Sequence, residues 1–189
     1  IMALPLALLS MYCYQRQKPW SMALLFFAFI QIYLGATIFL VIPFALFFAE
    51  LFTATATRQS IKLIGAALLG MAAGIIISPY FPENLPFLKV QILDSGLSAA
   101  KDIGSEWKPY NAWSFFTMSA PLGILWLFCL LYRLRQPAAW NSTSIGLLLI
   151  NVGLFVLTLK ARRFIEYWPI FALLNAADMA RDLPQKYLT

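Results

Sequence analysis

The 189-residue chain contains no histidine, only two cysteines and few charged residues. Without histidine, and with no group of cysteines or acids at ligand spacing, the sequence offers no dedicated metal site. Cys13 and Cys129 both lie in apolar segments, so we interpret them as small buried hydrophobic residues and expect no disulfide. Charged residues make up 12% of the chain, against roughly a quarter in a soluble domain. The scarcity of charge therefore excludes an ordinary water-soluble protein.

Hydrophobic residues make up 61% of the chain and are gathered in long runs. A helix needs about 20 apolar residues to cross the hydrocarbon core of a bilayer, so these runs predict a polytopic membrane protein. The net charge of +6 is then a topology signal, because lysine and arginine mark the loops that stay in the cytoplasm. No long basic face is interleaved with aromatic residues, so nucleic acid is not an expected partner.

The apolar runs predict an all-α, polytopic transmembrane helical bundle of about seven spans. The chain begins at Ile1 inside an apolar run, without a charged n-region, so we expect residues 1–189 to be one membrane domain that lacks its N-terminal part, with a truncated first span. Residues 20–53 are too long for one helix at ~1.5 Å per residue against a core of about 30 Å. We therefore expect two helices broken near residues 35–37, with Pro43 kinking the second. Further spans are expected at residues 61–78, 119–132, 143–159 and 164–177.

A long loop, residues 80–118, mixes charges of both signs. Leu85, Leu88 and Ile92 recur in it at helical spacing and predict a short amphipathic helix on the membrane surface. When the basic turns that follow the first, third and fifth spans are placed in the cytoplasm, this loop falls on the non-cytoplasmic side. Glu50, near the cytoplasmic end of its predicted helix, is interpreted as an interfacial residue.

The segment KARRFIEYWP, residues 160–169, breaks this charge pattern. Its cations, Lys160, Arg162 and Arg163, fall in a very short turn on the non-cytoplasmic side. The planar fork of arginine matches phosphate oxygens, so the turn is a candidate site for an anionic ligand such as a lipid phosphate or diphosphate. Alternatively, the chain threads differently, or the cations snorkel to headgroups or pair with carboxylates such as Asp102, Glu106 and Glu166.

Two residues beyond the arginines extend this candidate site. Glu166 lies three residues after Arg163 and four after Arg162, so on an α-helix it would share a face with both. An ionisable group one turn inside an apolar run pairs or lines a wet cavity. Tyr167 would bring a hydroxyl to the same place, and Pro169 would kink the helix toward the cavity.

Three landmarks stand in order along the chain: ISPYFPENLPF at 77–87, GSEWKPYNAWSFF at 104–116 and KARRFIEYWPIFALL at 160–174. Together they resemble the C-terminal half of bacterial polytopic membrane proteins related to GT-C glycosyltransferases, a superfamily that includes dolichyl-phosphate-mannose-type and undecaprenyl-phosphate-sugar-dependent enzymes. The Glu-Trp-x-Pro element at 106–109 and the Arg-Arg-Phe segment at 162–164 match that pattern. The family's Asn-Pro-Tyr-Gly element reads Ser-Pro-Tyr-Phe at 78–81, which departs at two positions.

The resemblance implies a glycosyltransferase of the bacterial inner membrane. It would transfer a sugar from a polyprenyl-phosphate donor on the non-cytoplasmic face, with the lipid-linked sugar and membrane lipids as partners. The phosphate would be held by Lys160, Arg162 and Arg163. The substrate-binding candidates are Glu106, Trp107, Glu166 and Tyr167; Trp107 would stack on a sugar ring or, equally, anchor the loop at the interface.

Catalysis in such relatives depends on an acidic residue in the first external loop, which acts as a base or a metal ligand. That loop would lie upstream of Ile1, so no catalytic residue is assigned and a divalent metal enters only through the resemblance. Two other functions stay open. A transporter or flippase of an anionic lipid or solute would line its path with Arg162, Arg163 and Glu166. A structural membrane subunit would saturate both arginines with protein carboxylates.

Overall fold

The structure is a computed structural model that describes residues 3–32, 34–89, 109, 111–136 and 140–181. In these residues it contains eight α-helices, two 3-10 segments and no strand, which confirms the all-α prediction. The helices are α1 (Ala3–Gln15), α2 (Pro19–Ile32), α3 (Val41–Phe52), α4 (Arg58–Ile77), α5 (Asn84–Lys89), α7 (Ala112–Leu134), α8 (Ser142–Lys160) and α9 (Trp168–Ala180). The 3-10 segments are η1 (Leu34–Leu40) and η5 (Arg162–Glu166).

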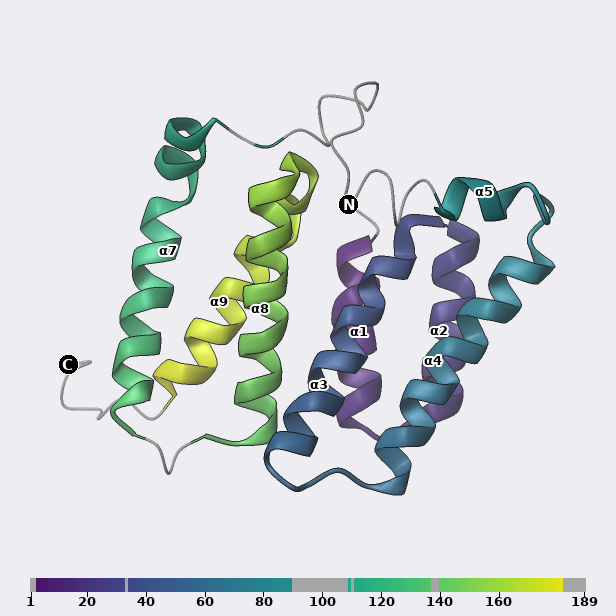
Figure 1. The fold of residues 1–189 in the computed structure, drawn as a ribbon. Helices are drawn as coiled ribbons and strands as arrows, with labels where there is room; N and C mark the ends of the chain where they lie inside the picture. Colours follow the sequence, from purple (N-terminus) through teal and green to yellow (C-terminus); the bar gives the residue numbers. More distant parts are fainter. Residues whose placement is uncertain (1–2, 33, 90–108, 110, 137–139, 182–189) are drawn as a thin grey trace.

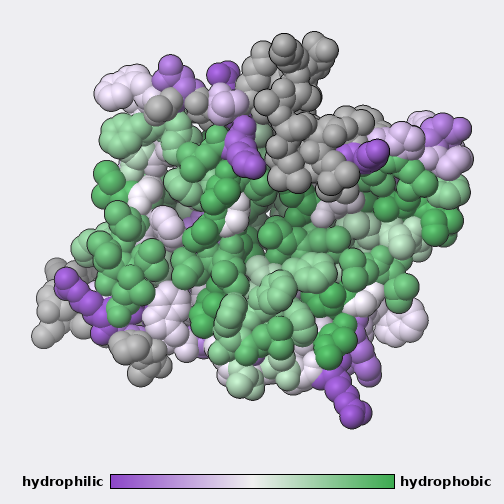
Figure 2. Space-filling view, viewed as in Figure 1, coloured by the Kyte–Doolittle hydropathy of each residue, from purple (hydrophilic) through white to green (hydrophobic). Residues whose placement is uncertain are grey.

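Three of the described helices, α4, α7 and α8, are long and apolar enough to cross a membrane. The space-filling view shows apolar side chains covering the middle of the visible face, with most polar side chains gathered at its two ends (Figure 2). Such a band is typical of a protein that lies in a bilayer. The helices α1, α2, α3 and α9 have only 12 to 14 residues, so the count of seven spans stays a prediction.

The long helices run side by side in alternating directions and form two groups (Figure 1). In the first group, α1 to α4, the main contact is between α2 and α4; in the second, α9 packs against both α7 and α8. The two groups meet along a seam between α3 and α8. A methyl group on Gly146 of α8 would lie 2.6 Å from the side chain of Leu46 on α3, so the seam is closely packed.

The break expected in residues 20–53 is present, because α2 ends at Ile32 and α3 begins at Val41 after the 3-10 segment η1. Pro43 is the third residue of α3, which follows the 3-10 segment η1 without a gap. The kink expected at Pro43 stays a prediction.

Gly70 and Gly74 form a G-x-x-x-G pair, a pattern that predicts close helix packing, and such packing is present where α4 crosses α2. A Cβ atom on Gly70 would overlap the backbone carbonyl of Ala23, and one on Gly74 would lie 3.0 Å from the carbonyl oxygen of Phe27. The side-chain amide of Gln31 donates a hydrogen bond of 2.7 Å to the carbonyl of Gly74. Small residues let two helix backbones approach in this way, which is the usual means of association in lipid.

The two ends of the bundle carry different chain segments. At one end, which we call the basic face, lie the turns that follow α1, α3 and α7 and the end of α9, with Arg16, Arg58, Arg135 and Arg181. At the other end, the loop face, lie η1, α5, η5 and the start of α7. The helix α5 occupies the start of the predicted 80–118 loop; Ile92 lies outside the described residues, so the amphipathic surface helix remains a prediction.

Candidate functional site

The cationic segment that the sequence singled out forms a break between two helices at the loop face. Helix α8 ends at Lys160, Ala161 is extended with φ −144° and ψ 129°, and α9 begins only at Trp168. Between them, residues 162–166 form the 3-10 segment η5. The α-helical face expected for Glu166 and both arginines is therefore wrong, because a 3-10 helix has three residues per turn and aligns position 166 with 163 but not with 162.

Pro169 also has a different role from the one expected. It lies in the first turn of α9, where proline is favoured because its fixed φ suits the helix and its missing N–H costs nothing. The change of direction instead comes from Ala161 and η5. The break places Lys160 and Arg162 at the end of the bundle, with both side chains exposed.

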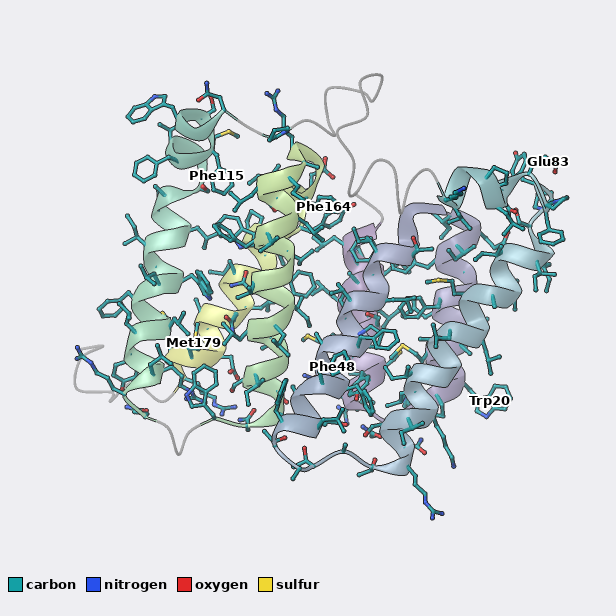
Figure 3. All side chains as sticks on the ribbon, viewed as in Figure 1. Trp20, Phe48, Glu83, Phe115, Phe164 and Met179 are labelled. Atoms are coloured by element: carbon teal, nitrogen blue, oxygen red, sulfur yellow. The ribbon has the colours of Figure 1, made fainter. Side chains whose placement is uncertain are left out.

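Arg162 joins two of the three sequence landmarks. Its Nε donates a hydrogen bond of 3.2 Å to the carbonyl oxygen of Pro109, the last residue of the Glu-Trp-x-Pro element. Figure 3 labels Phe115, near the start of α7, and Phe164, in η5, toward this same end of the bundle. Pro109 therefore lies beside the cationic turn, and the expectation that the rest of this element shares its face stays a prediction. Glu106, Trp107 and the side chain of Arg163 lie outside the described residues.

The two residues proposed to extend the site differ in their surroundings. The Glu166 side chain is exposed rather than buried in the apolar run. The Tyr167 side chain is buried, and its ring meets the ring of Phe39 edge-on at a centroid distance of 5.1 Å. Tyr167 thus packs η5 against η1 in the core, and its assignment to substrate binding stays a prediction without support from this contact.

A buried polar cluster near the basic face was missed in the sequence. Arg133 on α7 is fully buried, and its Nη2 donates to the hydroxyl oxygen of Ser144 at 3.3 Å. The Ser144 hydroxyl donates in turn to Oδ2 of Asp178 on α9 at 2.5 Å. The sequence places Arg133 with Arg135 in the basic turn after the fifth span, but Arg133 lies inside α7, which ends at Leu134. The three groups tie α7, α8 and α9 together.

Two buried asparagines lie farther into the same group. The indole nitrogen of Trp126 donates to Oδ1 of Asn175 at 2.8 Å, which links α7 to α9. Asn151, on α8, is fully buried, and neither its amide nitrogen nor its oxygen has a hydrogen-bond partner among the described residues. Buried polar groups are nearly always paired, so burial of the Asn151 amide without a partner lowers the stability of the bundle.

A polar cavity of about 370 Å³ lies at the basic face, where the seam between the two groups ends. Its walls come from the end of α1, from α3 and from the first turn of α8. The Tyr14 hydroxyl donates a hydrogen bond of 3.1 Å to Glu50 at this place. No pattern in the sequence predicts this cavity, because the segments that form its walls are far apart in the chain.

Within the described ranges, no three side chains of His, Cys, Asp or Glu come together as a metal site would need. Metal dependence, which enters only through the family resemblance, stays a prediction. Comparison of the chain with protein-family models, with curated proteins and with solved structures found no match. The GT-C resemblance therefore rests on the sequence motifs alone.

Proposed function

We propose that this chain is the lipid-phosphate-binding half of a membrane glycosyltransferase that uses a polyprenyl-phosphate-linked sugar. The observation that carries the proposal is the contact between Arg162 and the Pro109 carbonyl at a helix break on the loop face. It brings Arg162 and Pro109, which belong to two of the three family-like motifs, to one place.

The depth of the cations supports a lipid phosphate as the ligand. Helix α8 has 19 residues, which at ~1.5 Å each is close to the thickness of the hydrocarbon core. Lys160 ends this helix and Arg162 follows it, so in a bilayer that α8 spans both would lie at the level of the headgroups. A polyprenyl phosphate has its charged group at that level, with its chain in the bilayer.

The chemistry of sugar transfer fits this position. When the bond between sugar and lipid phosphate breaks, the bonding electrons stay on the phosphate oxygen and its negative charge grows. Cations held at that oxygen stabilise the transition state more than the ground state, which is the requirement for acceleration. Lys160 and Arg162, with Arg163 beside them in the chain, would take this role.

The test is the binding of undecaprenyl phosphate to the chain in lipid nanodiscs, measured by native mass spectrometry. Arg162→Ala and Lys160→Ala should each weaken binding about tenfold, because each removes a charge-assisted hydrogen bond. Arg162→Lys should fall between wild type and Arg162→Ala, since it keeps the charge and loses the fork. The matched control is Arg135→Ala, an exposed arginine on the opposite face. Unchanged binding in both loop-face alanine variants would refute the proposal.

A second candidate function is transport of an anionic lipid or solute. It is favoured by the buried asparagines in α8 and α9, since polar groups inside a membrane bundle often line a path. Liposomes that contain the protein and a fluorescent anionic lipid separate the two functions. A transporter moves the lipid between leaflets without any sugar donor, and Asn151→Leu should slow that movement; a lipid-phosphate site alone binds the lipid without moving it.

A further inference from the structure

The cavity at the basic face has the composition of a binding site for a polar group. Of the seven described residues that line it, six carry polar side chains and only Leu46 is apolar. Its volume of about 370 Å³ would hold a dozen waters, at about 30 Å³ each, or one small polar ligand. It lies at the opposite end of the bundle from η5, so it is separate from the proposed lipid-phosphate site.

The only charged residue of α3 projects into this cavity. Glu50 follows nine apolar residues of that helix and is half-buried. The Tyr14 hydroxyl donates to its Oε2, but among the described residues no lysine or arginine pairs with the carboxylate. The neighbouring guanidinium of Arg16 lies over the ring of Tyr12, at 5.4 Å from its centroid. A partly buried carboxylate without a cation is an attractive site for a positive ligand.

A second acceptor is fixed in the same wall. The side-chain oxygen of Gln17 is buried and has no donor among the described residues. The Gln17 amide nitrogen donates to the carbonyl of Tyr14 at 3.3 Å, which orients the group. Its backbone, at a left-handed φ of 55°, is held by a hydrogen bond of 3.1 Å from Gln59 on α4. A carboxylate and a fixed carbonyl oxygen suit a primary ammonium, a compact cation with three N–H donors.

The remaining wall suits a negative group. Ser142 and Thr143 are the first two residues of α8, and the Asn141 side chain caps this helix by accepting from the backbone nitrogen of Ser144 at 2.9 Å. The N-terminus of a 19-residue helix carries a partial positive charge and free N–H donors that favour phosphate. The hydroxyls of both residues add further donors. One wall of the cavity, with Glu50 and Gln17, therefore suits a cation, and another wall, at the first turn of α8, suits an anion.

We propose that this cavity binds a phosphoethanolamine group, with its ammonium at Glu50 and Gln17 and its phosphate at the first turn of α8. Two sources carry this group: the headgroup of phosphatidylethanolamine at the membrane surface, and soluble phosphoethanolamine. A phosphocholine group fits the charges but not the acceptors, because its trimethylammonium has no N–H to donate. Selection of ethanolamine over choline is thus the distinctive expectation.

The experiment compares three probes on the detergent-solubilised full chain: dihexanoyl phosphatidylethanolamine, dihexanoyl phosphatidylcholine and O-phosphoethanolamine. Binding is measured by native mass spectrometry for the lipids and by calorimetry for the soluble probe. The ethanolamine lipid should bind at least about tenfold more tightly than the choline lipid. Its ammonium can donate hydrogen bonds to the Glu50 carboxylate, and the trimethylammonium of choline cannot. If only the soluble probe binds, the natural ligand is a solute; if the ethanolamine lipid binds, it is a lipid. Equally tight binding of the two lipids, or no binding of any probe, overturns the proposal.

Two variants with opposite expected effects on ligand binding are used, because a variant that merely fails to fold can only lose binding. Glu50→Gln removes the charge and keeps the size, so it should abolish the preference for ethanolamine. Gln17→Glu adds a second carboxylate at the same wall, so it should raise the affinity several-fold. The matched control, Glu83→Gln, changes an exposed acid near α5 on the loop face and should bind as wild type does (Figure 3). A Glu50→Gln protein that keeps the preference, or a Gln17→Glu protein that loses it, would contradict the assigned residues.

Discussion

The α1–α4 group and the α7–α9 group lie side by side along the seam, yet they hold their helices together by different means. In the first group the buried side chains between helices are mostly apolar, with Met22, Phe26 and Leu63 among them. Ser10 donates to the carbonyl of Ala7 within its own helix. The bonds between helices of this group, from Tyr14 to Glu50 and from Gln31 to the carbonyl of Gly74, each involve a side chain that is not fully buried. In the second group, fully buried polar side chains, among them Arg133, Ser144 and Asn175, bond from one helix to another.

These two ways of holding helices together are the ones available inside a lipid bilayer. In lipid there is little hydrophobic force between helices, so association depends on close packing or on interhelical hydrogen bonds. The first group uses close packing at the glycines of α4, and the second uses the chain of bonds from Arg133 through Ser144 to Asp178. Changes of shape should therefore damage the first group most, and changes of polarity the second.

The largest effect is expected where α4 crosses α2. Gly70→Ala would force its methyl group into the carbonyl of Ala23 and should lower the free energy of unfolding by roughly 3 kcal/mol through overpacking. Gly65→Ala, in the same helix, meets no atom within 4 Å and should stabilise by about 1 kcal/mol from helix propensity. Thermal unfolding in detergent, followed by circular dichroism, should separate the two variants clearly. Equal stability would mean that α2 and α4 do not touch at Gly70.

A smaller effect is expected in the polar cluster of the second group. Ser144→Ala removes the hydroxyl between Arg133 and Asp178 and should cost roughly 2 kcal/mol, because buried polar groups lose a partner. Ser114→Ala, at an exposed position of α7, is the matched control and should change little. The same unfolding measurement applies. A neutral Ser144→Ala would show that the serine is not needed to join the three helices.

The smallest effect, and the one that sharpens the comparison, concerns the two buried asparagines. Asn151→Leu replaces an unpartnered amide with an apolar side chain of similar size and should raise the free energy of unfolding by about 1 kcal/mol. Asn175→Leu should lower it by about 1 kcal/mol, because the Trp126 indole loses its acceptor. A loss of stability in Asn151→Leu as well would indicate a bound water or ligand that satisfies the amide.

The sequence was informative wherever composition alone decides the outcome. The long apolar runs predicted helices, the length of residues 20–53 predicted the break before α3, and Gly70 with Gly74 predicted close packing. Each of these features is local or depends on segment length against the bilayer. The cationic turn was also found, because its charge is anomalous for its place in the chain.

The remaining features depend on contacts that no local pattern encodes. The 3-10 geometry of η5 separates Arg162 from Glu166, although their spacing of four suggested one α-helical face. Tyr14 and Glu50 lie 36 residues apart, and their meeting requires the packing of α1 against α3. Arg133 resembles any basic residue near a helix end until α8 and α9 are placed around it.

The seam between α3 and α8 bears on how the protein is made. Among the described helices, the seam is the main contact between the two groups, and all of the first group precedes all of the second in the chain. The first group can therefore assemble in the bilayer while the ribosome is still translating the second, since domains made earlier fold earlier. Helix α3 would then present a finished surface to which α8 docks as it is inserted. Two separately expressed pieces, divided in the long loop, should consequently be able to reassociate in the membrane.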